Sequence, residues 1–529
     1  MLKIIFAIPL LLHMVAGAEA AESKPALKPL PYRIVSFHRG RADKALIRRA
    51  AELGFNGVMF QLEGGNVVPL KQFAERNKAE GYIDLCHSLG MKVTLWVHEL
   101  SDIPGEGKPG YLGPITVDNK ELWSHINDRY DWLLGELLPD VDGLVLTVVE
   151  TQIRATDTDL MLKLTDIISK KCIQYKKDFI VRTFTWHPDE LEGVMGCVQK
   201  LPPDIIIMSK CVPQDWQLRG IHDKAIGAVQ PHEQIVEYDI AGEYFLREQV
   251  ANCMPGLLKN QFDYGLTKGV DGICVRVDRG DDEVLHAPQE VNLWALGMFA
   301  AGKTNSVDEV WKAWAKSRYG EKAAPGVIKA LKPTLDVVTE CLNIGSFSFG
   351  DTRGFPPPNG DRDALLTNWA NFRWDPAYIP EYKLGLAGDP GYTKKIEGQK
   401  KKAMRLAQQC LDDLEKAKDK LDPVEYEILQ SKLLTNKIQL EIRAPMMVAY
   451  LKYRRILNTG DQAEKIRLAT DIRRGLETIR SAVDRQYPPM REIEHMGRKW
   501  RVGAPDGIDI TKTHTWVDKM ESLLAGQGL

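Results

Sequence analysis

Residues 143–186, GLVLTVVETQIRATDTDLMLKLTDIISKKCIQYKKDFIVRTFTW, contain an apolar run, an amphipathic stretch and a second apolar run in direct succession. The two apolar runs, 143–150 and 179–185, are rich in β-branched residues and continuously rather than alternately hydrophobic. Such runs are typical of parallel strands that are covered on both faces. Between them, residues 157–177 carry apolar side chains at helical period. The segment therefore predicts a strand, a helix and a second, parallel strand.

Six more apolar runs of the same kind extend this pattern along the chain, at 33–37, 57–62, 92–97, 205–210, 235–240 and 272–278. Amphipathic stretches such as ADKALIRRAAELG separate most of them, although LRGIHDKAIGA, between the sixth and seventh runs, is short for a helix. Eight such units predict an α/β fold, a (β/α)8 or TIM barrel over residues 32–302. A doubly wound open sheet is the alternative, but no glycine-rich phosphate loop follows the first run.

The character of the sequence changes after residue 302. Strand patterns disappear, and the segment 344–382 is rich in glycine, proline and aromatic residues. Three long stretches have helix-forming composition, at 394–421, 423–457 and 462–487. They predict an α-helical C-terminal domain over residues 303–529, packed against the barrel. The basic run KIEGQKKKAMR, at 395–405, is expected to be a solvated helix face.

The N-terminus has the three parts of an export signal. Lys3 supplies positive charge, the apolar stretch IIFAIPLLLHMVAG follows, and AEA at 18–20 matches a small-x-small cleavage site. A retained membrane anchor is the alternative, but the apolar stretch is shorter than the ~20 residues that a span needs. We expect a signal peptide over residues 1–20, a linker over 21–31, and a periplasmic or secreted protein.

Composition narrows the classes of partner. The chain has 529 residues with 70 basic and 72 acidic side chains, so no basic excess indicates nucleic acid or an anionic membrane. Its eight cysteines include no CxxC pair, and its histidines include no HxxxH pair. Free, buried cysteines are expected, and neither a metal nor another cofactor. A homodimer through the helical domain stays open.

Three acids that follow predicted strands carry the functional prediction: Glu150 after GLVLTVV, Asp215 after IIIMSKCVPQ and Glu243 after IVEYDIAG. In such barrels the carboxyl ends of the strands build the active site. Cleaving a glycosidic bond needs one carboxylic acid to protonate the leaving oxygen and one carboxylate to activate water or attack the sugar. Each acid could instead cap a helix or pair with a base. Further acids near strand ends are not distinguished by position alone, namely Glu63, Glu99, Glu237, Asp239 and Asp278.

The residues around these acids resemble a known family. VPQDWQLR, preceded by Lys210, is similar to the Lys-x-Gly-Pro-x-Asp-Phe-Gln segment of the glycoside hydrolase family 67 α-glucuronidases. VEYDIAGEYF is similar to that family's Glu-x-x-x-x-Gln-Glu-Tyr segment, and HAPQEVNLWALGMFAAG to its His-x-x-x-x-Asn-x-Tyr-x-Phe-Gly-Arg pattern. The segments occur in the family's order, and a helical domain follows the barrel in both. The resemblance implies a carbohydrate as the binding partner.

Residue by residue, the resemblance implies that Glu150 is the general acid, that the base is drawn from Asp215 and Glu243, and that the anomeric configuration inverts. Arg182 would contact a uronate carboxylate and Lys210 the sugar. The alternative for both is a salt bridge to neighbouring active-site carboxylates.

The sequence also departs from the family. Leu146 stands where the family carries a uronate-directed lysine, and Val212 and Met298 replace a glycine and an arginine of its motifs. The family's N-terminal β-domain is not expected. The sugar could therefore differ, and a retaining glycosidase acting on a neutral sugar and a non-catalytic carbohydrate-binding barrel remain alternatives.

Several further side chains are candidates for binding the sugar. Trp216 and Tyr244, each beside a candidate acid, are expected to stack on sugar faces. His98 and Arg276, at the ends of the third and eighth predicted strands, are candidate hydrogen-bond donors. The other aromatic candidates are more often core residues than sugar platforms: Trp96, Trp186 and Trp374.

Overall fold

The computed structural model describes residues 28–38, 42–62, 67–101, 104–149, 151–213, 218, 221–240, 250–279, 282–348, 374–487, 489–503 and 509–529. Eight parallel strands close into a barrel in sequence order, and β8 pairs with β1. The strands are β1 (Tyr32–Phe37), β2 (Gly57–Gln61), β3 (Lys92–Val97), β4 (Gly143–Thr147), β5 (Asp178–Arg182), β6 (Ile206–Lys210), β7 (Gln234–Asp239) and β8 (Gly272–Arg276). The predicted (β/α)8 barrel is confirmed, and because the sheet is closed the open-sheet alternative is wrong.

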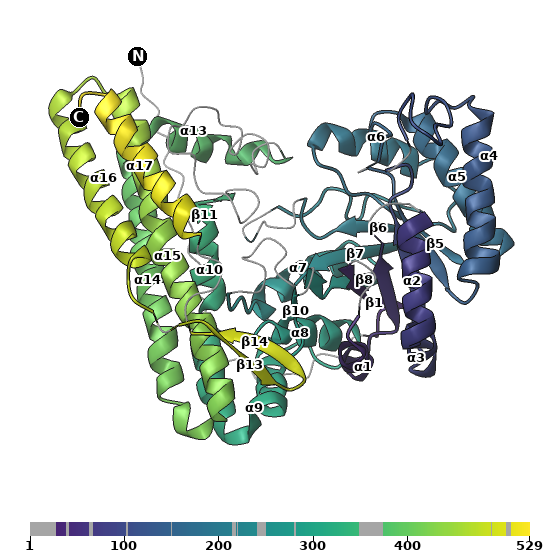
Figure 1. The fold of residues 1–529 in the computed structure, drawn as a ribbon, viewed down its shortest axis with the longest axis horizontal. Coiled ribbons are helices and arrows are strands. Elements are labelled where there is room, and N and C mark those ends of the chain that lie inside the picture. Colours follow the sequence, from purple (N-terminus) through teal and green to yellow (C-terminus); the bar gives the residue numbers. More distant parts are fainter. Residues whose placement is uncertain are drawn as a thin grey trace, which may run out of the picture.

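Helices cover the outside of the barrel (Figure 1). They are α1 (Lys44–Leu53), α2 (Val67–Glu80), α3 (Tyr82–Ser88), α4 (Lys120–Trp132), α5 (Thr158–Gln174), α6 (Pro188–Val198), α7 (Pro255–Thr267) and α8 (Glu290–Ala300). Aspartates cap the starts of α1 and α5, where Asp43 accepts a hydrogen bond from Ala45 N and Asp157 from Leu160 N. The described part of the connection between β6 and β7 contains no helix, as the short LRGIHDKAIGA segment indicated.

The interior of the barrel changes from apolar to polar toward the carboxyl ends of the strands. An apolar cluster that includes Ile34, Met59, Val145, Ile180 and Ile235 fills its lower part. Above it, inward positions near the carboxyl ends of several strands are polar yet buried, at Ser36, Gln61, Thr147, Arg182, Lys210, Glu237 and Arg276. This polar layer is the floor of the mouth where barrel active sites are built.

The second part of the molecule is helical, as predicted. Its helices are α9 (Val307–Leu331), α10 (Thr334–Leu342), α13 (Ile379–Ala387), α14 (Pro390–Glu415), α15 (Pro423–Asn458), α16 (Gln462–Val483) and α17 (Ile510–Gly526). Figure 1 shows α14, α15 and α16 together on the side of the molecule away from the barrel strands. Aspartates with prolines behind them start two of these helices, because Asp389 and Asp422 each accept hydrogen bonds from the first turn.

One hydrophobic core joins the two parts, because a single cluster includes barrel residues and residues of α9, α10, α14 and α15. Directional bonds reinforce it. Asn436 of α15 accepts a hydrogen bond from Ala251 N and donates one to Ala251 O, both at 2.8 Å. Cys253 N donates to Thr334 Oγ1 of α10 at 3.1 Å. The helical domain is therefore fixed to the loop before α7.

Strands after residue 302 were not expected, and this expectation is wrong. Two antiparallel pairs occur there, β11 (Asn343–Ile344) with β12 (Phe347–Ser348), and β13 (Arg491–His495) with β14 (Arg498–Val502). The second pair packs Trp500 and Val502 against Ile428 of α15. Its other side chains are largely charged and outward, so it has little of the hydrophobicity from which strands were recognised.

All eight cysteines are free and buried, as predicted. Within the described residues, no helix combines the length and the apolar character that crossing a membrane requires.

Candidate active site

The strands that precede the three candidate acids end at one mouth. β4 ends at Thr147, β6 at Lys210 and β7 at Asp239. Glu150, Asp215 and Glu243 follow shortly afterwards in the sequence, together with Trp216 and Tyr244. All five lie outside the described residues, so their assigned roles stay predictions. What the structure describes is the polar layer at the carboxyl ends of the strands.

A buried ion cluster lies in that layer, with Glu237 of β7 at its centre. Arg182 holds the carboxylate with two hydrogen bonds, from Nε to Oε2 at 2.6 Å and from Nη2 to Oε1 at 2.9 Å. Lys210 Nζ and Arg276 Nη1 each lie 3.8 Å from Glu237 Oε1. All four side chains are buried. Three of the predicted sugar-binding or donor residues are thus brought together, around a carboxylate with no predicted role.

Aromatic rings form the walls of this cluster. The Arg182 guanidinium lies 4.3 Å from the ring centroid of Trp96 and 4.7 Å from that of Phe184. Lys210 Nζ lies 4.4 Å from the Phe184 ring. Trp96 is itself fixed, because its Nε1 donates to Thr147 Oγ1 at 2.6 Å. Cation–π contacts and the bidentate ion pair therefore hold the Arg182 side chain in one orientation.

The cations decide the protonation of Glu237. Burial alone would raise the pKa of its carboxyl, but the charges of Arg182, Lys210 and Arg276 outweigh burial and hold the pKa below its usual range. Glu237 is therefore ionised at neutral pH and cannot serve as a proton donor there. Its role is to position the cations.

A second buried acid lies nearby with the opposite shift. Asp223, in the connection between β6 and β7, accepts a hydrogen bond from Ala225 N at 2.8 Å. Burial raises the pKa of Asp223 to about 6, although that hydrogen bond and the charges of Lys210 and Arg182 act against the rise. Two neighbouring carboxyls thus titrate differently because only one of them directly contacts the cations.

The remaining candidates occupy different environments. His98 lies beside Trp96, with ring centroids 5.4 Å apart, at the carboxyl end of β3. Trp186 is partly buried and packs edge-on against Phe184 at 5.0 Å. Trp96 and Trp374 are only 1% exposed, and Trp374 packs against Leu191 and Ala225. Those two tryptophans are core residues in this structure rather than exposed sugar platforms.

Two other positions singled out in the sequence lie outside the barrel interior. Glu99 accepts hydrogen bonds from Arg129 Nη1 at 2.5 Å and from Tyr130 Oη at 2.9 Å, both on α4. Glu99 therefore links the end of β3 to helix α4 and has a structural role. Leu146 packs in the outer core with Leu144, whereas Val145 between them faces the interior. Because position 146 faces the helices, the leucine there does not alter the described floor of the mouth.

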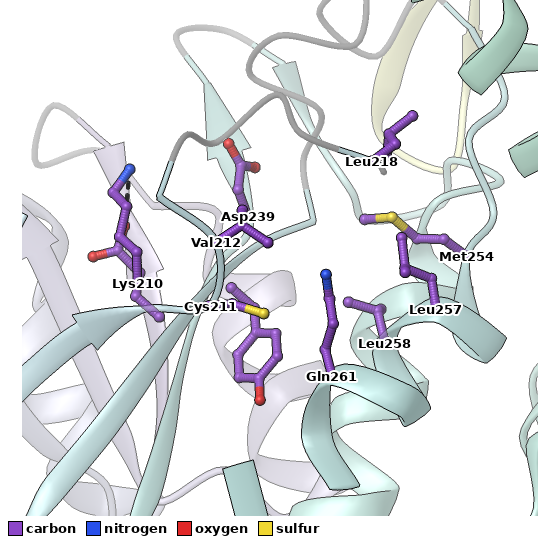
Figure 2. Close-up of a pocket in the computed structure, with 11 residues that line it drawn as sticks. Lys210, Cys211, Val212, Leu218, Asp239, Met254, Leu257, Leu258 and Gln261 are labelled. Atoms are coloured by element: carbon purple, nitrogen blue, oxygen red, sulfur yellow. Dashed lines mark ion pairs between the residues drawn. The ribbon is translucent and has the colours of Figure 1, made fainter. Parts of the chain in front are cut away.

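Beside the cluster, a small pocket of about 20 Å³ lies between the ends of β6 and β7 and helix α7. It has room for about one water molecule and not for a sugar. Figure 2 shows Lys210 pointing away from the α7 residues Leu258 and Gln261, and its ion pair with Glu237 is drawn dashed. The charged end of Lys210 therefore belongs to the barrel mouth, not to this pocket.

Glu237 is the residue that sequence reasoning named among the strand-end acids without giving it a role. The signal was present in IVEYD, because alternation along a strand puts Glu237 on the same face as Ile235 and Asp239. The pairing of Lys210 with Glu237 in the β6–β7 register then brings the two together.

No protein-family model matches the sequence, and no curated protein matches it. Solved structures do resemble it. A GH138 enzyme targeting pectin rhamnogalacturonan II matches with a TM-score of 0.66 and 11% identity, over 95% of this chain and 85% of that one.

Two others match more weakly. A GH115 4-O-methyl-α-glucuronidase with specificity for decorated arabinogalactans has a TM-score of 0.48 and 12% identity, over 86% and 59% of the two chains. The O-GlcNAc hydrolase of Thermobaculum terrenum has a TM-score of 0.46 and 12% identity, over 94% of each chain. These neighbours are glycoside hydrolases. At 11% identity, the likeness to the GH138 enzyme shows a shared fold alone.

Proposed function

We propose that this protein is an exported glycoside hydrolase that removes an α-linked uronic acid, or a related acidic sugar, from an oligosaccharide or polysaccharide. The observation that carries the proposal is the convergence of Arg182, Lys210 and Arg276 on the floor of the barrel mouth. A concave site with several fixed cations favours an anionic ligand over a neutral one. For a glycoside hydrolase of this fold, the expected anionic ligand is a uronate, the ionised form of a uronic acid.

The catalytic roles follow the sequence assignment. Glu150 protonates the leaving oxygen, and Asp215 or Glu243 activates a water on the opposite face of the sugar. An inverting mechanism requires the acid and the base to be about 6.5–9.5 Å apart. Glu237 is excluded from the acid role because its pKa is lowered and both its oxygens are engaged by Arg182.

The choice of polymer to test first comes from the similar GH138 enzyme, which targets pectin rhamnogalacturonan II. Acidic pectic oligosaccharides therefore head the panel, followed by glucuronate-decorated oligosaccharides. Incubation with the purified protein should release a free uronic acid, detected by anion-exchange chromatography.

Variants test the roles. Glu150→Gln should lower kcat by about 10²–10⁴-fold, because the leaving oxygen loses its proton donor. Asp215→Asn and Glu243→Gln should separate the base from its partner, with the larger loss at the base. Glu136→Gln, on the outer face of the barrel, is the control and should retain full activity. Undiminished turnover in Glu150→Gln would overturn the assignment of the acid.

A further inference from the structure

A groove with a volume of about 640 Å³ runs between α14 and α16 in the helical domain, with α15 as its floor. The floor is largely apolar, with Leu440, Ala444 and Val448, and its acid Glu441 is paired with Arg485 at 3.1 Å. A second hollow of about 440 Å³ continues it toward the starts of α14 and α16. Both hollows share Glu397, Lys452 and Asp471, so together they form one elongated surface groove.

The acids at the middle of this groove, Glu397 and Asp471, are paired with cations. Lys452 Nζ lies 2.8 Å from Glu397 Oε1 of α14 and 3.4 Å from Asp471 Oδ2 of α16. This lysine therefore ties the three helices together. Lys452 supplies one positive charge for the two carboxylates, and Arg474 supplies a second, with its Nη1 3.6 Å from Asp471 Oδ1.

Along α14, the groove is also lined by cations that are not paired with acids in the described part of the chain. Lys394, Lys401 and Arg405 are exposed and line the groove, and none of them forms an ion pair with any residue that the structure describes. Arg467 of α16 also lines the groove, is exposed and forms no ion pair with any residue that the structure describes. At a helical rise of 1.5 Å, the row from Lys394 to Arg405 is about 16 Å long. The walls thus present a line of positive charges rather than a single point.

The basic run KIEGQKKKAMR was expected to be only a solvated helix face, and it has three environments instead. Lys400 borders the groove but is buried and pairs with Glu340 at 2.8 Å, whereas Lys402 is exposed and lies outside the groove. Lys401 and Arg405, one helical turn apart, line the groove. The run therefore contributes specific residues to a concave surface.

We propose that this groove binds a stretch of acidic polysaccharide as a second, non-catalytic site. An elongated open groove with a row of like charges suits an extended polymer with repeated carboxylates, and the apolar floor suits the C–H faces of sugar rings.

This inference rests on the proposed function, because it takes the ligand to be the polymer that carries the acidic sugar. A polymer held at the groove is present at a high effective concentration near the barrel. Binding at the groove should therefore favour long chains over short ones.

The test is binding of polygalacturonate, with dextran as the neutral probe, to the full chain by affinity electrophoresis and calorimetry. Lys401→Glu/Arg405→Glu should weaken polygalacturonate binding by about tenfold or more and reduce its salt dependence. Lys395→Glu/Lys402→Glu makes the same charge change on the same helix outside the groove, and should alter binding less than about twofold. Lys401→Gln/Arg405→Gln serves if the charge reversal fails to fold.

Equal losses in the two double variants would overturn the proposal, as would wild-type affinity for dextran or duplex DNA that matches the affinity for polygalacturonate. Turnover of small α-uronides by the wild-type protein is measured separately. If turnover is absent but the groove variant alone loses polymer binding, the proposed function fails and the groove stands. Intact turnover with unchanged polymer binding removes the groove alone.

Discussion

Glu237 contacts three buried cations, and its ionised carboxylate is what allows them to lie together in the barrel mouth. Because its pKa in the folded protein is lowered, its contribution to stability is fully present above the unfolded pKa of about 4.3. That contribution is lost as the pH falls through the folded pKa.

Glu237→Gln leaves the buried cations without this partner, and breaking a buried ion pair in this way costs about 3–5 kcal/mol. We expect a loss of that size in the free energy of unfolding at pH 7, measured by urea denaturation, and a smaller loss below pH ~4. Glu233→Gln, an exposed acid that accepts from Tyr32 Oη at the opposite end of β7, is the control and should change little. A neutral effect of Glu237→Gln would show that the cluster does not depend on this carboxylate.

The contribution of Asp223 to stability should depend on pH in the opposite direction to that of Glu237. The folded pKa of Asp223, about 6, lies above the unfolded value, so its contribution is present below the unfolded pKa and is lost as the pH rises through 6. Asp223→Asn cannot ionise, and the asparagine oxygen can still accept from Ala225 N. The variant should therefore gain about 1.5 kcal/mol relative to the wild type between pH 5 and pH 8. Asp204→Asn removes an exposed carboxylate before β6 and should change the free energy of unfolding by about 0.5 kcal/mol or less. A difference between Asp223→Asn and the wild type that does not change with pH would refute the raised pKa of Asp223.

The sequence pattern predicted that Arg182, Lys210 and Arg276 lie at strand ends, and the structure brings these three side chains together. It did not reveal that they share Glu237, because four strand-end acids besides Glu237 were equally plausible from position. The deciding information is which way each side chain points. Glu99 points to α4 while Glu237 points inward, and a difference of one residue in strand phase separates these outcomes.

The strands and long helices were predictable because each carries its own signal. Continuous β-branched runs with amphipathic stretches between them specify parallel strands under helices, whatever the rest of the chain does. The β13–β14 pair was not predictable in this way. Its stability depends on Trp500 and Val502 packing on α15, a contact between segments far apart in the sequence.

Hydrogen bonds between Asn436 of α15 and Ala251 join α15 to the loop before α7. Asn436 satisfies both backbone groups of Ala251, and all of these groups are buried. Asn436→Ala would leave a buried N–H and a buried C=O without partners, which costs about 2–4 kcal/mol.

Differential scanning calorimetry should show a lower melting temperature for Asn436→Ala and an earlier loss of the barrel–helix contact. Asn458→Ala removes the same side chain at the exposed end of α15 and should change stability by about 0.5 kcal/mol or less. Equal effects of the two variants would mean that the Ala251 bonds do not couple the two parts.

Over the whole molecule, a near-neutral net charge conceals two separated groups of cations. One lies on the floor of the barrel mouth and the other along the α14 wall of the groove. The overall charge balance gave no indication of a nucleic-acid or anionic-membrane partner. The structure shows why that reasoning is incomplete, because Glu397 and Asp471 are paired with Lys452 while neighbouring cations on the same walls are not.

The central claim is that the barrel mouth selects a sugar with a carboxylate. The most direct measurement is kcat/KM for matched substrates, 4-nitrophenyl α-D-galacturonide against the α-D-galactoside and the α-D-glucuronide against the α-D-glucoside, followed by ¹H NMR of the released sugar. We expect one uronide to be cleaved at least about 100-fold faster than its neutral partner, with the β-anomer appearing first. Equal or faster cleavage of the neutral sugar, or first release of the α-anomer, would contradict the account.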